Sequence, residues 1–228
     1  MTQIIEKTVK CPICGNPVEI YQYLSFFSYG QYLDTKYIGG DPYYLNYCEK
    51  CNYVSPDFEE EPSPKVKAVI ASKEYKYIFT KAQKESTPIE VLKLLAQIHI
   101  RKALNAPDME IGYLYLKLAW CGDDSAWITS DIPVRGRVVS LHKAKEYRLE
   151  AIKYFEKSNK EKDRLVLVDL YRRTGQFDKA SRLLSETNFS EQYAGICKQQ
   201  KELVAVKDIE EHKIEHEDKL KGLGAIIW

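Results

Sequence analysis

The spacing of apolar residues divides the chain into two parts. Up to about residue 53, apolar and polar residues alternate in short runs, which indicates β-strands over residues 4–9, 17–27 and 43–47. After about residue 64 the apolar period lengthens to between three and four residues, which is typical of amphipathic helices. The pattern therefore predicts a small β-rich domain followed by a mainly α-helical one.

A proline-rich, acidic run separates the two parts. Ser55-Pro56 is followed by residues 59–64, whose prolines and like charges resist packing. We therefore place a boundary after residue 62, with a first domain over residues 1–62 and a helical domain over residues 63–221. Residues 222–228 follow as a separate apolar tail.

The helical part contains seven predicted helices, over residues 66–77, 88–104, 108–121, 140–155, 165–173, 178–186 and 190–221. Thr87-Pro88-Ile89-Glu90 has the composition of a capping box, which predicts a well-defined start for the second helix. Gly122 is expected to cap the end of the third, and Ser190 the start of the last. Residues 123–139 are expected to form a long irregular link.

Part of the helical domain has the spacing of a tetratricopeptide motif, carried by Leu167, Tyr171, Gly175, Phe177, Ala180 and Leu184. Gly175 makes the turn between two helices in this interpretation, and the small Ala180 lets them approach. Ala151 and Phe155 resemble the second helix of a preceding repeat, although the interval from Ala151 to Ala180 is 29 residues rather than about 34. We therefore predict an array of helical hairpins whose register stays open.

The first domain contains two Cys-x-x-Cys pairs, at residues 11–14 and 48–51, with 33 residues between them. A two-residue spacer lets both sulfurs of a pair face one ion, so two pairs predict a tetrahedral four-thiolate site. Gly15 and Asn52 follow the pairs and suit the positive φ of a metal-binding turn. We predict one structural zinc ion, with iron as the alternative. The predicted ligands are Cys11, Cys14, Cys48 and Cys51.

Residues 21–53 contain nine tyrosines. Aromatic rings can stack on nucleic-acid bases, but Lys36 and Lys50 are the cations available in this segment. We favour the interpretation that the tyrosines build a small core around the metal. Cys121 and Cys197 lie outside the pairs and are expected to be buried core residues.

Composition and charge limit the functions that fit. The chain has 228 residues, a net charge of +1, and 44% hydrophobic and 29% charged residues, as in an ordinary folded protein. Residues 1–62 carry four lysines against nine acidic residues, a formal charge of −5, which disfavours binding to nucleic acid. The N-terminus lacks the apolar run of a signal peptide, and no run approaches the ~20 residues of a membrane span. We expect a cytoplasmic protein that contacts neither nucleic acid nor membrane.

The motifs together resemble a known family. Cys-Pro-Ile-Cys near the N-terminus, residues 39–44 (Gly-Gly-Asp-Pro-Tyr-Tyr), Cys-Glu-Lys-Cys followed by Asn52-Tyr53, and the later helices are similar to the uncharacterised bacterial domain-of-unknown-function family 2225, over roughly residues 7–186. Family members usually show Cys-Gly-Tyr-Ala at the second pair, where this chain has Cys51-Asn52-Tyr53-Val54. The resemblance implies a fold that is mainly α, a tetratricopeptide-like array preceded by a zinc-ribbon-like domain, and no established activity.

Three functions compete. Stacked helical hairpins offer an extended groove, which favours a zinc-binding cytoplasmic scaffold or adaptor for a protein or peptide. The alternatives are a nucleic-acid-binding zinc ribbon and an enzyme with a dithiol pair or a catalytic metal. Four cysteines close the metal's coordination shell, whereas catalytic zinc keeps one position open, so we predict no catalytic residues.

The histidines and the tail bear on further sites. The four histidines, His99, His142, His212 and His216, lack the His-Glu-x-x-His spacing of zinc proteases. His212 and His216 share a face of the predicted last helix, which we interpret as a solvated charged face rather than a metal site. The tail carries Leu223, Ile226, Ile227 and Trp228, and we expect it to dock in its own chain or in a second copy, as a homodimer.

Overall fold

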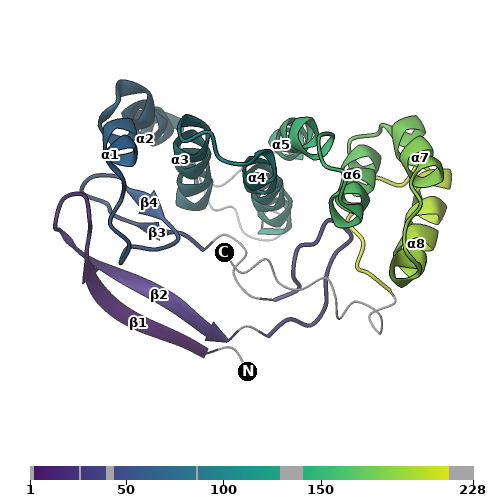
Figure 1. Cartoon of the computed structure of the whole chain (residues 1–228), viewed down its shortest axis with the longest axis horizontal. Helices are drawn as coiled ribbons and strands as arrows, with labels where there is room; N and C mark the ends of the chain where they lie inside the picture. Colours follow the sequence, from purple (N-terminus) through teal and green to yellow (C-terminus); the bar gives the residue numbers. More distant parts are fainter. Residues whose placement is uncertain (1–2, 26, 40–43, 86, 129–140, 216–228) are drawn as a thin grey trace.

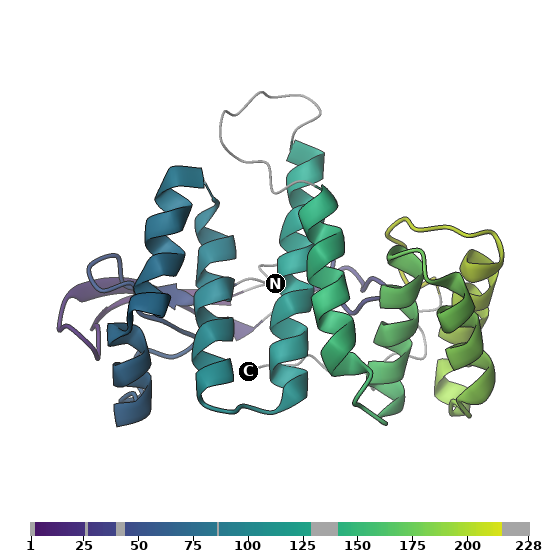
Figure 2. The same ribbon diagram turned by 90° about the horizontal axis from the view of Figure 1, so that it is seen from above.

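The computed structural model describes residues 3–25, 27–39, 44–85, 87–128 and 141–215. A small β region leads into a row of helices that succeed one another in space in chain order (Figures 1 and 2). The helices are α1 (Pro64–Ala71), α2 (Lys73–Glu85), α3 (Ile89–Ala103), α4 (Asp108–Ile128), α5 (Leu141–Phe155), α6 (Glu161–Arg173), α7 (Phe177–Glu186) and α8 (Ala194–Ala205). The row bends, and the β region lies on its open side (Figure 1). The prediction of a mainly helical fold with a small N-terminal β region is confirmed, and its tetratricopeptide-like character stays a prediction.

Two antiparallel strand pairs form the β region. Strand β1 (Gln3–Lys10) pairs with β2 (Pro17–Ser25), and β3 (Asn46–Tyr47) pairs with β4 (Val54–Ser55). The first Cys-x-x-Cys turn joins β1 to β2, and the second joins β3 to β4. A two-stranded pair is too small to bury a core of its own, so the β region depends on the helices beside it.

The first predicted helix is two helices, because Ser72 interrupts it. Ser72 has an extended backbone, and its N–H donates to the carbonyl of Val69 (3.0 Å), which ends α1. Its hydroxyl then accepts the N–H of Tyr75 (3.2 Å) and caps the start of α2. The predicted capping box at the next helix is wrong: Pro88 is the N-cap residue of α3, and no side chain caps it.

Gly122 lies inside α4, so the prediction that it caps the helix is wrong. A Cβ atom at residue 122 would lie 2.6 Å from the Cβ of Ala144 in α5, and one at Gly112 would lie 3.0 Å from that of Tyr154. The two glycines therefore let α4 and α5 approach closely. Helix α4 also covers residues 123–128 of the predicted link, and residues 129–140 lie outside the described residues.

Helices α6 and α7 form the predicted helical hairpin. Gly175 has φ +81° in the turn between them, and Ala180 is fully buried. Gly175 and Ala180 therefore occupy the places predicted for them in this one hairpin, and the repeat register stays a prediction.

The predicted helix over residues 190–221 is wrong at both ends. A short 3-10 turn (Glu191–Tyr193) precedes α8, and the hydroxyl of Ser190 bonds Glu161 (2.7 Å) instead of capping a helix. Helix α8 ends at Ala205, and Lys207 takes a left-handed φ of 55°. Residues 206–215, which we name the return segment, then run back over the array without forming a helix.

Arg172 explains why the return segment is not helical. Its guanidinium donates to the backbone carbonyls of Asp208 and Glu210, both at 2.8 Å. A contact across the fold thus replaces the local hydrogen bonds that these charged residues would make in a helix. The predicted helical face of His212 and His216 is therefore also wrong for His212, and His216 and residues 222–228 lie outside the described residues.

Two clusters of buried apolar residues form the core. The first joins the β region to α1–α4, and it includes Cys11, Ile20, Cys48, Tyr53 and Phe58. The second joins α4–α8 to Leu33 of the β region and Ile214 of the return segment. Among the described residues, no helix is long and apolar enough to cross a membrane.

Candidate metal centre

The two Cys-x-x-Cys turns have the same backbone hydrogen bonds. The N–H of Gly15 donates to the carbonyl of Cys11 (2.9 Å), and the N–H of Asn52 donates to that of Cys48 (2.7 Å). In each turn the first cysteine's own N–H donates to the carbonyl five residues further on (2.8 and 3.0 Å). Gly15 has φ +69° and Asn52 has φ +61°, as the sequence predicted. The two turns therefore present their sulfurs in the same way.

The four cysteine sulfurs lie close together. All four Sγ atoms are within 4.8 Å of one another, and the pairs Cys11–Cys51 and Cys14–Cys48 are each 3.6 Å apart. A tetrahedron with zinc–sulfur distances of about 2.3 Å has edges of about 3.8 Å, so this arrangement fits a single ion. Among the described residues, no other group of three or more cysteine, histidine or acidic side chains brings its ligand atoms together in this way. The cluster could hold a metal, and zinc as its identity stays a prediction.

Helix α2 supports the second cysteine turn. The hydroxyl of Tyr75, which is fully buried, donates to the carbonyl of Asn52 (2.7 Å). The hydroxyl of Tyr47 donates to the Asn52 side chain (2.7 Å), and the Tyr47 ring stacks on Phe79 with centroids 5.8 Å apart. Sequence reasoning missed Tyr75 and Phe79, although their spacing of four residues, which suits one face of a helix, was the available signal.

The predicted tyrosine core around the metal is correct only in part. Tyr53 is buried and stacks on Phe58, with ring centroids 5.1 Å apart, and Tyr47 is half-buried. By contrast, Tyr21 is 46% exposed and Tyr29 is 75% exposed. Between the cysteine pairs the chain also reaches the later helices, where Leu33 is buried, so its tyrosines do not share one core.

Burial and hydrogen bonds shift the pKa of the cysteine thiols. Burial raises the pKa of Cys11 and of Cys51. Burial also opposes ionisation of Cys14, but hydrogen bonds from the Asn16 N–H and from the other thiols outweigh it and lower the pKa of Cys14. A bound divalent cation favours the thiolate at every ligand position. The remaining cysteines, 121 and 197, are buried in the helical core, as predicted.

A second group of polar residues, most of them buried, lies on the open side of the array. It joins residues 28–38, helices α4–α6 and the return segment. We name it the charge cluster, and it contains Asp34, Lys36, Asp123, Asp124, Arg148, Asp169, Arg172, Arg173, Asp208 and Glu211. Sequence reasoning missed the cluster, because its partners are as far apart as Lys36 and Asp124, 88 positions along the chain.

Asp34 lies at the centre of the charge cluster. Its side chain is 1% exposed, accepts the indole N–H of Trp120 (2.6 Å) and lies 3.5 Å from the guanidinium of Arg173. Arg173 and Arg148 both contact Asp123. Burial raises the pKa of Asp34. The contacts of Asp34 fix residues 28–38 to α4 and α6, and the Arg148–Asp123 pair links α5 to α4.

Glu211 is the weakly held carboxylate of the cluster. Among the described residues its Oε1 atom accepts no hydrogen bond, and the cations nearest to it are Lys36 at 3.5 Å and Arg173 at 3.7 Å. Burial, and next the negative charge of Asp34, raise the pKa of Glu211 to about 7. The cluster therefore includes a carboxyl group that titrates near neutral pH.

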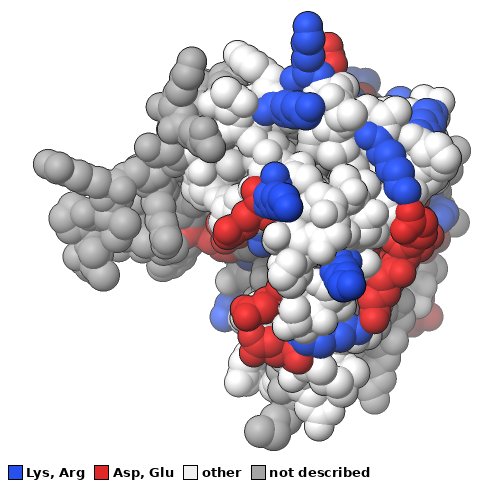
Figure 3. Space-filling view, turned by 90° about the vertical axis from the view of Figure 1, so that its left-hand side faces the viewer, with Lys and Arg blue, Asp and Glu red and all other residues white. Residues whose placement is uncertain are grey.

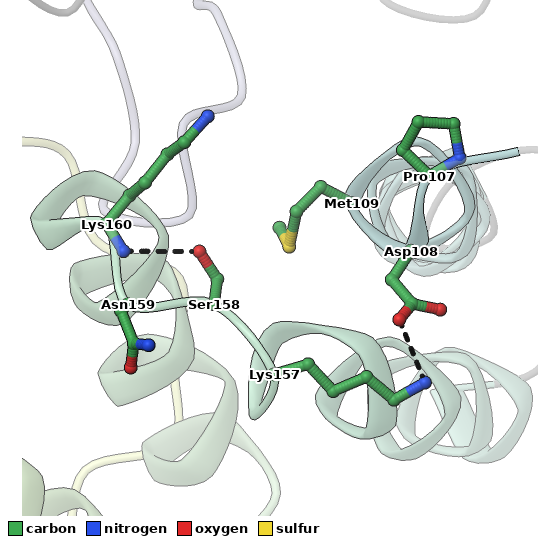
Figure 4. Close-up of a pocket in the computed structure, with 7 residues that line it drawn as sticks. All are labelled: Pro107, Asp108, Met109, Lys157, Ser158, Asn159 and Lys160. Atoms are coloured by element: carbon green, nitrogen blue, oxygen red, sulfur yellow. Dashed lines mark hydrogen bonds and ion pairs between the residues drawn. The ribbon is translucent and has the colours of Figure 1, made fainter.

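A shallow pocket of ≈ 500 Å³ lies elsewhere, between the α3–α4 and α5–α6 turns (Figure 4). It is lined by Pro107, Asp108, Met109, Lys157, Ser158, Asn159 and Lys160. Lys157 and Asp108 form an ion pair (3.0 Å), and the backbone N–H of Lys160 donates to Ser158 (3.3 Å). The lining residues include no histidine or cysteine, and the hydroxyl of Ser158 donates to the carboxylate of Asp163 (2.6 Å).

The surface at the α1–α2 end mixes charges of both signs. Figure 3 shows basic and acidic side chains interleaved over this face. The segments here form the ion pairs Lys7–Glu59 (2.6 Å) and Lys67–Glu61. This face therefore lacks the uniform positive charge with which a zinc ribbon attracts nucleic acid.

Comparisons of the chain with protein-family models, with curated proteins and with solved structures gave no match. The resemblance to domain-of-unknown-function family 2225 therefore stays a prediction. The structure itself identifies the centre as four cysteines, arranged to fit one metal ion, where the β region meets the first helices.

Proposed function

We propose that this chain is a zinc-binding scaffold. One zinc ion at the four cysteines holds the β region against α1–α3, and the open side of the array receives a protein or peptide partner. The proposal rests chiefly on the sulfur cluster, whose spacing suits one tetrahedral ion and whose ligands Cys11 and Cys48 belong to the core shared with the helices. Four thiolates complete the coordination shell of zinc, which favours a structural over a catalytic ion.

Exposed apolar side chains at the end of β2 and just after it support the partner-binding part of the proposal. Leu24 is 57% exposed, Phe27 is 51% exposed, and Tyr29 is 75% exposed. The rings of Phe27 and Tyr29 meet edge to face with centroids 5.2 Å apart. The end of β2 and the segment after it run along the open side of the row of helices (Figure 1). Exposed aromatic surface of this kind is typical of protein–protein contacts.

Metal analysis of the full-length protein tests the zinc site. We expect one zinc per chain, lost in Cys14→Ser and in Cys51→Ser because three thiolates bind the ion more weakly. Cys197→Ser is the matched control and should keep its zinc, since this cysteine is buried among the later helices. Full zinc occupancy in Cys51→Ser would contradict the assignment, and a visible absorption band would identify iron instead.

Photo-crosslinking in the protein's own cells tests the partner surface. A photoreactive amino acid replaces Tyr29 in one protein and Tyr77 of α2, which is 62% exposed, in a control. We expect a discrete crosslinked protein at position 29 and none at position 77. Equal products at both positions, or none at either, would count against a partner on the open side.

A further inference from the structure

Residues 28–38 form a hairpin that lies between the two cysteine pairs in the chain. The N–H of Tyr29 donates to the carbonyl of Ile38 (3.0 Å), and the N–H of Ile38 donates to that of Gly30 (2.9 Å). Thr35 takes a left-handed φ of 73° at the tip. Because one cysteine pair precedes the hairpin and the other follows it, the metal site anchors the chain on both sides of it.

The tip of the hairpin is buried against the helical array. Leu33 is 3% exposed and packs in the core of α4–α8. Asp34 accepts the indole N–H of Trp120 (2.6 Å), and Lys36 pairs with Asp124; both partners belong to α4. The hairpin thus occupies part of the open side of the array, as a bound peptide would.

The return segment holds the hairpin from its other edge. The N–H of Leu33 donates to the carbonyl of His212 (3.0 Å), and the N–H of Ile214 donates to that of Gln31 (2.8 Å). Gln199 of α8 fixes the return segment in turn, by donating to the carbonyl of Lys213 (2.6 Å). The hairpin is therefore bound on two sides by parts of the chain that do not contain the four clustered cysteines.

We propose that the metal site and the docked hairpin form one switch: metal binding holds the hairpin on the array, and metal loss releases it and uncovers Trp120 and Arg173. This inference rests on the proposed zinc site. It adds to that function a means of regulating access to the open side of the array.

The coupling between metal binding and hairpin docking comes from the conformational entropy of the chain. With metal bound, the cysteine pairs fix both ends of the 33-residue segment that carries the hairpin, so docking orders a short loop. Without metal the β region loses its cross-link, and docking must order a longer, freer chain. The helices α4–α8 keep their own apolar cluster in either state. Coupling is reciprocal, so contacts of the hairpin tip should also strengthen metal binding.

Trp120 gives a direct readout of hairpin docking. Replacing Trp127 and Trp228 by phenylalanine leaves Trp120, which is 5% exposed, as the single indole of the full-length chain. We expect chelation of the metal to shift its emission to the red and to remove its protection from acrylamide. Adding zinc should reverse both changes. Hydrogen exchange should show residues 28–38 losing protection while α6 and α7 keep theirs.

Each other outcome has a distinct meaning. If metal analysis verifies complete removal of the metal and Trp120 is still protected, the switch is overturned, but the assignment of the zinc site stands. Loss of exchange protection throughout α6 and α7 would also overturn it, because the array would then unfold as a whole. Protein that never contains metal would refute the proposed function itself.

A reciprocal measurement tests the same coupling from the hairpin. Leu33→Ala removes apolar contacts that dock the hairpin tip in the core of α4–α8, and we expect it to weaken zinc affinity, on the order of tenfold, in a chelator competition. Leu149→Ala is the matched control, because Leu149 of α5 is 40% exposed. Equal zinc affinity in the wild type and in Leu33→Ala would contradict the coupling.

Discussion

Replacing Glu211 by glutamine should stabilise the protein at alkaline pH. Glu211 is half-buried in the charge cluster, beside Lys36 and Arg173 but also near Asp34 and Asp123, whose charges repel it. Glutamine keeps nearly the same shape and removes the charge. Since ionised Glu211 costs more in the folded chain than in the unfolded one, its removal is favourable wherever the carboxyl group is ionised.

The raised pKa gives the sign and size of the effect. The pKa of Glu211 rises from 4.5 to about 7 on folding, so between these values the folded chain binds the proton more tightly than the unfolded chain. Proton binding to Glu211 stabilises the folded chain fully below pH 4.5, and this stabilisation is lost as the pH rises through 7. A shift of this size corresponds to about 3 kcal/mol, and screening at a side chain 16% exposed reduces our expectation to about 2 kcal/mol.

Urea unfolding followed by circular dichroism provides the assay, with wild type and variant compared at pH 5 and at pH 8. We expect Glu211→Gln to be more stable than wild type by about 2 kcal/mol at pH 8 and by a much smaller amount at pH 5. Any change at the cysteine cluster between the two pH values affects both proteins alike. Glu210→Gln, an exposed neighbour, should show no such pH-dependent gain. A variant less stable than wild type at pH 8 would refute the reasoning, because attraction to Lys36 and Arg173 would then outweigh repulsion.

Two further substitutions test the packing of the array. Arg172→Met leaves Asp169 buried without its cation, and in urea unfolding we expect it to lower the free energy of unfolding by about 3–5 kcal/mol. Arg182→Met, at an exposed position, should lower it little. Similar losses in both variants would contradict the role of Arg172. Gly122→Ala should cost about 1–3 kcal/mol by thermal unfolding, since its Cβ would lie 2.6 Å from that of Ala144, and adding Ala144→Gly should restore part of the loss. Wild-type stability in Gly122→Ala would show that α4 and α5 can separate easily.

Local signals in the sequence predicted the cysteine cluster well. Two residues separate the cysteines of each pair, and the conformations of Gly15 and Asn52 follow from glycine's freedom and asparagine's tolerance of positive φ. The turn at Gly175 was predictable for the same reason. In these cases the chemistry that determines the structure lies within a few residues.

Long-range contacts explain the failures. Residues 207–221 are charged enough to suit a helix, yet Arg172 binds the backbone of Asp208 and Glu210 and draws the chain away from that path. Gly122 is a residue type that often ends a helix, but in the structure it leaves room for the side chain of Ala144 in the next helix. The charge cluster had no sequence pattern at all, because the residues that satisfy Asp34 come from α4 and α6.

The pairing of the hairpin with the return segment sets an order of events during synthesis. Gln31 leaves the ribosome 183 residues before Ile214, with which it bonds, a delay of roughly 10–40 s at 5–20 residues per second. Throughout this interval the nascent chain carries Leu33 and Asp34 without the return segment, even after α4 has emerged. If the cysteines bind zinc as proposed, both turns are complete by residue 52 and are available to the ion long before then. Metal supply during translation would therefore decide whether both ends of the hairpin segment are already held at the cysteine site when the helices that bury the hairpin emerge.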